Sequence, residues 1–167
     1  MKFTKLVSEG KITNYSLEKL NFEKEIDKHG KIDDVLSPNN TILTQIIKEP
    51  ISTKGPRISS ELSFAGRFLV LIPFSNRISV SQKIKSKKER DRLKKLIEEF
   101  RPKGFGVIIR TVAQGKKIAE LEKDLQSMYN QWLTLCSKIN GAKPPSRILS
   151  DLFNSLNILE GGFAPLI

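Results

Sequence analysis

Apolar positions along the chain fall into dense runs and spaced stripes, and each pattern predicts a different element. Dense runs at 41–49, 67–72 and 105–113 contain β-branched and other apolar residues and predict strands, the last two of them buried. Residues 58–63 lead into the second run through Ala65-Gly66, where a glycine would allow a close approach to the backbone. Residues 1–37 are polar and patchy, so we expect little regular structure there.

Two stripes of apolar residues predict helices. Ser86 and Glu89 match a capping box, in which the hydroxyl and the carboxylate satisfy backbone N–H groups at a helix start, and Pro102 ends this first helix. The second stripe has apolar residues three and four positions apart: Ile118, Leu121, Leu125, Met128, Trp132, Leu135 and Ile139. Packing of this stripe on a sheet is favoured over a coiled coil, and Cys136 then belongs to the core. The order β, β, α, β, α predicts an α+β fold.

Positive charge is concentrated in one part of the chain. The sequence has 29 Lys and Arg against 18 Asp and Glu, a net charge of +11, and residues 81–117 hold 13 of the basic and 4 of the acidic residues. A focused basic surface supports salt-sensitive binding of polyanions such as nucleic acids. A lysine-rich helix face that only meets solvent explains the same charge run equally well.

The reactive side chains give no support for a catalytic or metal site. Cys136 is the only cysteine and His29 the only histidine, so a disulfide framework, a zinc site and a catalytic triad are not expected. The acidic residues, among them Asp124, are interpreted as solvated surface charges. We find no phosphate-binding glycine loop and no apolar run of membrane length, and we expect no secretory leader. A cytoplasmic protein is therefore expected.

Basic residues at a strand end and in a loop are better placed for binding. Arg110 ends a strand of the buried type, where a guanidinium can grip a phosphate through two parallel hydrogen bonds and the Thr111 hydroxyl can add a third. A structural salt bridge of Arg110 is the more common alternative. Lys54 and Arg57 lie in a Gly-Pro loop, where contacts to a phosphate backbone are plausible and plain surface charge is more common.

Four separated motifs resemble the ribonuclease E/G family. They are Lys-Gly at 54–55, Leu-Ser-Phe-Ala-Gly-Arg-Phe-Leu-Val-Leu-Ile-Pro at 62–73, Ser-Gln-Lys-Ile at 81–84 and Gly-Phe-Gly-Val-Ile-Ile-Arg-Thr-Val-Ala at 104–113. They occur in the family's order and near its spacing, and residues 53–62 are similar to its Bacteroidetes-type ribonuclease G branch. The resemblance covers residues 5–155.

The resemblance implies three segments. Residues 1–60 are expected to form a partial S1 domain, an OB-like β-barrel segment with an insertion. Residues 61–150 are expected to form a small α/β 5′-sensor domain. Residues 151–167 would be an incomplete RNase H-like segment with an atypical tail.

The resemblance also implies roles for single residues. In the family, the positions matching Arg110, Thr111, Gly66 and Val70 bind a 5′-monophosphate and surround the terminal nucleotide. The position of Lys54 contacts the RNA strand, and Arg57 and Lys83 are further candidates for the RNA backbone. The aspartates that bind magnesium and the cysteines that bind structural zinc are expected outside this chain, so no catalytic or metal residue is assigned here, and Mg²⁺ and Zn²⁺ are expected only in the full-length enzyme.

Three functions follow as hypotheses. The first is the RNA-binding and 5′-monophosphate-sensing part of a single-strand-specific endoribonuclease of RNA processing and decay, rRNA processing included, which does not cleave RNA by itself and is homo-oligomeric when intact. The second is a non-catalytic basic RNA-binding module, for instance a ribosome-associated one. The third is an interaction protein that oligomerises through Trp132.

Overall fold

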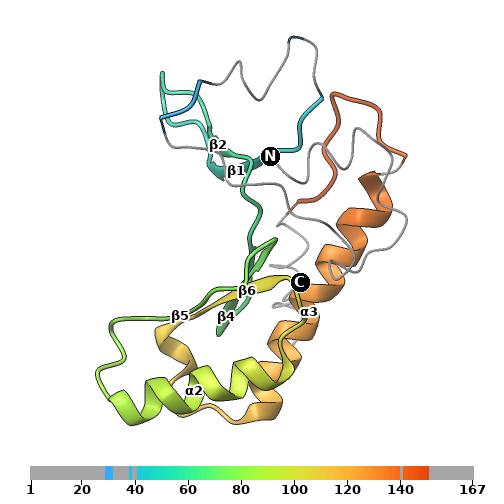
Figure 1. Cartoon of the computed structure of the whole chain (residues 1–167). Coiled ribbons are helices and arrows are strands. Elements are labelled where there is room, and N and C mark those ends of the chain that lie inside the picture. The colour runs from blue at the N-terminus through green and yellow to red at the C-terminus, as the bar shows by residue number, and fades with distance from the viewer. Residues whose placement is uncertain (1–28, 32–37, 39–40, 140, 151–167) are drawn as a thin grey trace, which may run out of the picture.

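A four-stranded sheet with two long helices forms the main part of the structure, a computed structural model that describes residues 29–31, 38, 41–139 and 141–150 (Figure 1). The strands β3 (Phe64–Ala65), β4 (Leu69–Pro73), β5 (Ile78–Val80) and β6 (Phe105–Ile109) lie in the order β3-β4-β6-β5. β4 is antiparallel to β3 and β6, and β5 is parallel to β6. The predicted α+β class is confirmed, and the expectations for 1–28, 32–37 and 151–167 lie outside the described residues.

The helices pack against the sheet next to each other. Helix α2 (Lys87–Phe100) connects the parallel strands β5 and β6 and contacts both. Helix α3 (Ile118–Ile139) contacts β3 and β4 and spans the residues that the apolar stripe predicts. A short 3₁₀ turn, η3 (Thr111–Ala113), links β6 to α3.

The core lies between the sheet and the helices. All of the predicted α3 stripe except Ile118 is buried, together with Cys136, while Ile118 is 41% exposed. The ring of Trp132 meets the rings of Phe64, Phe74 and Phe105 edge to face, with centroid distances of 6.3, 5.7 and 5.7 Å. Such contacts stabilise the core beyond what the buried area of the aromatic rings contributes.

A separate two-stranded sheet precedes the main sheet (Figure 1). Strands β1 (Gln45–Lys48) and β2 (Arg57–Ser59) pair antiparallel, and the side chain of Gln45 bonds both the N–H and the carbonyl of Ser63, at 2.8 and 2.9 Å. The predicted strand at 41–49 is therefore confirmed only over its second half.

One end of each predicted buried strand is shorter than expected, because backbone groups there form hydrogen bonds outside the sheet. At the start of β4, the N–H groups of residues 67–69 bond the Asp124 carboxylate, so the strand begins at Leu69. At the end of β6, η3 replaces the last predicted strand residues, 111–113. The sequence patterns also missed the short strands β3 and β5.

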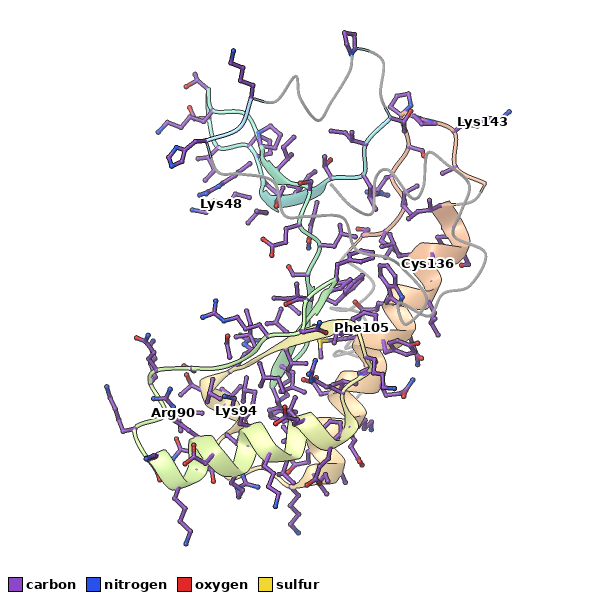
Figure 2. The ribbon with its side chains drawn as sticks, in the orientation of Figure 1. Lys48, Arg90, Lys94, Phe105, Cys136 and Lys143 are labelled. Atoms are coloured by element: carbon purple, nitrogen blue, oxygen red, sulfur yellow. The ribbon has the colours of Figure 1, made fainter. Side chains whose placement is uncertain are left out.

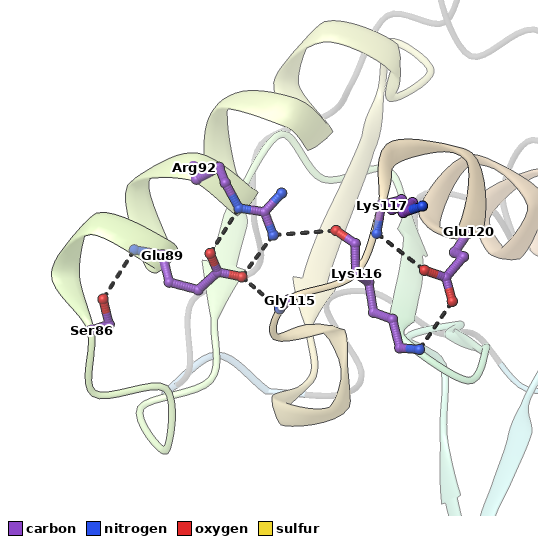
Figure 3. Close-up of polar contacts among 7 residues, drawn as sticks. All are labelled: Ser86, Glu89, Arg92, Gly115, Lys116, Lys117 and Glu120. Atoms are coloured by element: carbon purple, nitrogen blue, oxygen red, sulfur yellow. Dashed lines mark hydrogen bonds and ion pairs between the residues drawn. The ribbon is translucent and has the colours of Figure 1, made fainter.

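Only half of the predicted capping box forms. The Ser86 hydroxyl accepts the N–H of Glu89 at 3.3 Å, as predicted. The Glu89 carboxylate instead bonds the guanidinium of Arg92 at 2.7 Å and accepts the N–H of Gly115 at 2.8 Å. It therefore joins α2 to the loop before α3 (Figure 3).

Candidate phosphate-binding site at the strand ends

The ends of three strands meet at one edge of the sheet. The parallel strands β5 and β6 are paired through Val80 and Ile109, so the residues that follow them, Ser81 and Arg110, lie side by side. The N–H of Arg110 also bonds the carbonyl of Phe68 at 2.9 Å, just before β4 begins. Topology thus brings together residues that are up to 44 positions apart along the chain.

Arg110 has a fixed guanidinium with no carboxylate partner among the described residues. Its Nη1 donates to the carbonyl of Gly66 at 2.7 Å and, less closely, to that of Arg67 at 3.4 Å. The residue is exposed, and neither ion pair found in the described part includes it. A guanidinium held at one nitrogen keeps its other N–H groups for an incoming anion.

The Thr111 side chain lies beside a second hydroxyl. Its Oγ1 is 2.9 Å from the Oγ of Ser81, and either oxygen can be the donor. The Ser81 Oγ also accepts the N–H of Lys83 at 3.4 Å. No role was predicted for Ser81 from the sequence, although its place in the 81–84 motif was a usable signal.

Gly66 has no room for a side chain, because a carboxylate lies against it. A Cβ at this position would lie 2.6 and 2.7 Å from the two carboxylate oxygens of Asp124. The same carboxylate accepts the N–H groups of Arg67, Phe68 and Leu69 at 2.9, 2.8 and 2.9 Å. The interpretation of Asp124 as a solvated surface charge is therefore wrong, because this side chain holds the turn whose carbonyl positions Arg110.

Val70 lies on the sheet beside this turn. It pairs with Ala65 of β3 and with Ile108 of β6, which is 39% exposed. Val70 is half-buried, whereas its neighbours Leu69 and Leu71 are fully buried, so it lies on the more exposed face of the sheet. An apolar patch therefore lies near the Arg110 end.

Further cations surround the turn. The Arg67 guanidinium and the Lys116 ammonium each lie 5.2 Å from the centroid of the Phe68 ring. Lys83 is exposed in the loop after β5. Together with Arg110 these side chains give the edge a positive potential, which favours an anionic ligand.

Two nearby carboxylates are already engaged (Figure 3). The hydrogen bond from Arg92, with a further bond from the N–H of Gly115, lowers the pKa of Glu89 to about 2. The hydrogen bond from Lys116, helped by the N–H of Lys117, lowers the pKa of Glu120. These contacts fix the loop at 114–117.

Lys54 and Arg57 are not part of this edge. Lys54 bonds Ile51 through a backbone bridge, and Arg57 begins β2, so both belong to the separate β1–β2 unit. Both residues are exposed. Among the described residues, no group of three or more His, Cys, Asp or Glu side chains could hold a metal ion, and no helix is long and apolar enough to span a membrane.

Comparison with known proteins gives consistent matches. A family model described as the Ribonuclease E/G family matches residues 63–164. Ribonuclease E of Nostoc is 34% identical over 120 residues, which are 72% of this chain and 18% of that protein. Ribonuclease G of Escherichia coli K12 is 36% identical over 101 residues, 60% of this chain and 21% of that protein. Ribonuclease G of Haemophilus influenzae is 34% identical over 143 residues, 80% and 29% of the two chains. The chain thus spans less than a third of the length of these relatives.

Proposed function

The chain belongs to the ribonuclease E/G family, and from this premise we propose that it is the RNA-binding and 5′-monophosphate-sensing part of a single-strand-specific endoribonuclease. We call the strand ends with Gly66, Ser81, Arg110 and Thr111 the Arg110 edge, and their ligand is then the phosphorylated first nucleotide of an RNA strand.

The position of the Arg110 guanidinium carries this proposal. Its bond to the Gly66 carbonyl fixes one nitrogen, and the Thr111 and Ser81 hydroxyls lie at the same edge. A terminal monophosphate has more charge than an internal phosphodiester, so it gains more from a fixed cation and neutral donors. Val70 and Ile108 give the first nucleotide an apolar surface beside that phosphate.

The wider proposals rest on the resemblance. They include the limits of the S1, 5′-sensor and RNase H-like segments, a role in RNA and rRNA processing in the cytoplasm, and a homo-oligomeric intact enzyme. They also include RNA-backbone contacts by Lys54, Arg57 and Lys83. The described residues do not fit a magnesium or zinc site, so no step is assigned to either ion here.

Binding of two single-stranded RNAs that differ only in their 5′ group tests the proposed 5′-sensor. We expect the full chain to bind a 5′-monophosphorylated single-stranded RNA more tightly than the same RNA with a 5′-hydroxyl. Arg110→Gln should remove that preference, a loss of about 2 kcal/mol or roughly 30-fold in Kd for the phosphorylated strand. Fluorescence anisotropy titrations measure both constants.

Arg77→Gln is the matched control, because Arg77 is exposed and lies just before β5, at the opposite end of that strand. It removes the same charge and should leave the preference for the 5′-phosphate intact. If wild-type protein ignored the 5′-phosphate, or if both variants weakened binding equally, the chain would be a basic RNA-binding module and not a sensor. Hydrolysis of the RNA by this chain with magnesium would overturn the expectation that it does not cleave RNA.

A further inference from the structure

Helix α2 has its charges in the order that opposes the helix dipole. Six basic residues and two acidic residues lie in the first part of α2, between 87 and 95. The last turn of α2 has no basic residue and contains Glu98 and Glu99. Cations destabilise a helix N-terminus and anions destabilise its C-terminus, so most of these charges do not stabilise α2, apart from Glu89 in its first turn and Arg101 at its C-cap. A ligand outside the helix would account for the remaining cations.

The cations of α2 are also unpaired within the described part of the chain. Arg92 is bound by Glu89. The others are exposed, and their side chains have no ion pair or hydrogen bond to a described residue: Lys87, Lys88, Arg90, Lys94 and Lys95. Their charge is therefore available to a partner.

Three of these residues form one continuous row, which we call the basic flank: Lys87, Arg90 and Lys94. They are three and four positions apart, so they lie above one another on the helix surface, and Figure 2 shows Arg90 and Lys94 on the same side of α2. Arg92 points to the other side and donates to the Lys116 carbonyl at 3.3 Å.

The basic flank begins where the Arg110 edge ends. Ser81, whose hydroxyl meets that of Thr111, starts the short loop that leads to α2. Lys83 and Lys85 are exposed in this loop. The flank then extends about 10 Å along the helix, at 1.5 Å per residue. A strand held at Arg110 would thus meet one cation after another.

We propose that the basic flank is a second RNA-contact surface, which binds backbone phosphates downstream of the 5′ end. This inference rests on the proposed function for the identity of its ligand. Lysine ammonium groups on long stems suit a flexible polyanion, since they need no fixed geometry. A membrane surface fits less well, because a helix that binds lipid exposes its apolar face, whereas Leu93 and Ile97 of α2 are fully buried.

Binding to RNA of two lengths tests the flank in the full chain. The variant is K87Q/K94Q, and the control is K123Q/K138Q, which removes two exposed lysines from α3. With a single-stranded RNA of ~12 nucleotides, the flank variant should reduce the salt slope, d log K/d log[salt], by about 1.4 in magnitude, since each phosphate contact contributes about 0.7. That corresponds to about 25-fold weaker binding at 0.1 M salt, with the difference vanishing near 1 M.

A short RNA, the control variant and the stability of the flank variant provide further tests of the basic flank. A 5′-monophosphorylated trinucleotide, which reaches only the Arg110 edge, should bind both variants as it binds wild-type protein. An equal loss in K123Q/K138Q, or tighter binding to phosphatidylserine vesicles than to RNA, would overturn the proposal. A lower unfolding midpoint of K87Q/K94Q would also overturn it, because it would show that the lysines stabilise the helix.

The sensor and the flank can fail separately. If Arg110→Gln left binding unchanged while K87Q/K94Q weakened only the longer RNA, the 5′-sensor proposal would be wrong and the flank would stand. If only Arg110→Gln had an effect, the flank proposal would be wrong and the sensor would stand.

Discussion

The Arg110 edge and the basic flank are both positively charged, but their cationic side chains are positioned in different ways. At the edge, the Asp124 carboxylate fixes the turn at residues 66–69, and the Gly66 carbonyl of that turn fixes Arg110. On the flank, Lys87, Arg90 and Lys94 have no partner among the described residues. A fixed cation can recognise one particular group, whereas mobile cations attract any phosphate backbone. The two together can combine selectivity with affinity.

Of the changes considered, removing the Asp124 carboxylate should have the largest effect on stability and on the 5′-phosphate preference of the Arg110 edge. Asp124→Ala leaves three backbone N–H groups without their acceptor, two of which belong to residues that are 6% and 0% exposed, Phe68 and Leu69. We expect the free energy of unfolding to fall by about 3 kcal/mol and the preference for a 5′-phosphate to disappear, because the turn no longer positions Arg110. Urea denaturation measures the change in stability, and anisotropy titrations with the 5′-phosphorylated and the 5′-hydroxyl RNA measure the preference.

Glu122→Ala is the control for this prediction. Glu122 is exposed on the same helix, so its removal should change stability by less than about 0.5 kcal/mol. If Asp124→Ala were as stable as Glu122→Ala, the three hydrogen bonds would not determine the shape of the edge.

A side chain at Gly66 should have the next largest effect. The new Cβ of Gly66→Ala would lie within 2.8 Å of three Asp124 atoms, so the turn or α3 must shift. We expect a loss of about 2 kcal/mol in unfolding free energy and weaker binding of the 5′-phosphorylated strand. Differential scanning calorimetry and anisotropy report them.

Gly55→Ala provides a direct comparison, since nothing lies within 4 Å of a Cβ built at Gly55. This variant should keep both stability and 5′-phosphate preference near wild type. Equal behaviour of the two alanine variants would contradict the close packing of Gly66 on Asp124.

Local patterns predicted the helices well and the strand ends poorly. The α3 stripe gave Ile118–Ile139 because one face of that helix is almost wholly buried. The end of β6 and the start of β4 depend on bonds to residues far away in sequence, such as Phe68 with Arg110 and Leu69 with Asp124, which no local pattern contains. β3 and β5 have two and three residues, too few to show a periodicity.

The sequence predicted several residues of the candidate site but not the hydrogen bonds that hold them in place. Arg110, Thr111 and Gly66 lie at one edge, as the motifs suggested. The roles of Asp124 and Ser81 could not be derived, since an acidic residue on a helix gives the same sequence signal whether it is solvated or bonded to a distant backbone.

The smallest effect concerns the bond between α2 and the loop at 114–117. Glu89 has a pKa of about 2, held down by Arg92 and the N–H of Gly115, against an ordinary value of 4.5. A carboxyl group with a lowered pKa in the folded state stabilises the fold above its unfolded pKa, and this contribution is lost as the pH falls from about 4.5 towards 2. At neutral pH, Glu89→Gln should cost about 1 kcal/mol, because the pair lies near the surface, and the difference from wild type should shrink in acid. Denaturation across this pH range measures it, and Glu98→Gln, which removes an exposed carboxylate with no ion pair to a described residue, should change stability at neutral pH by less than about 0.5 kcal/mol. A difference between Glu89→Gln and wild type that stayed constant down to pH 2 would mean that the charge of Glu89 does not join α2 to the loop at 114–117.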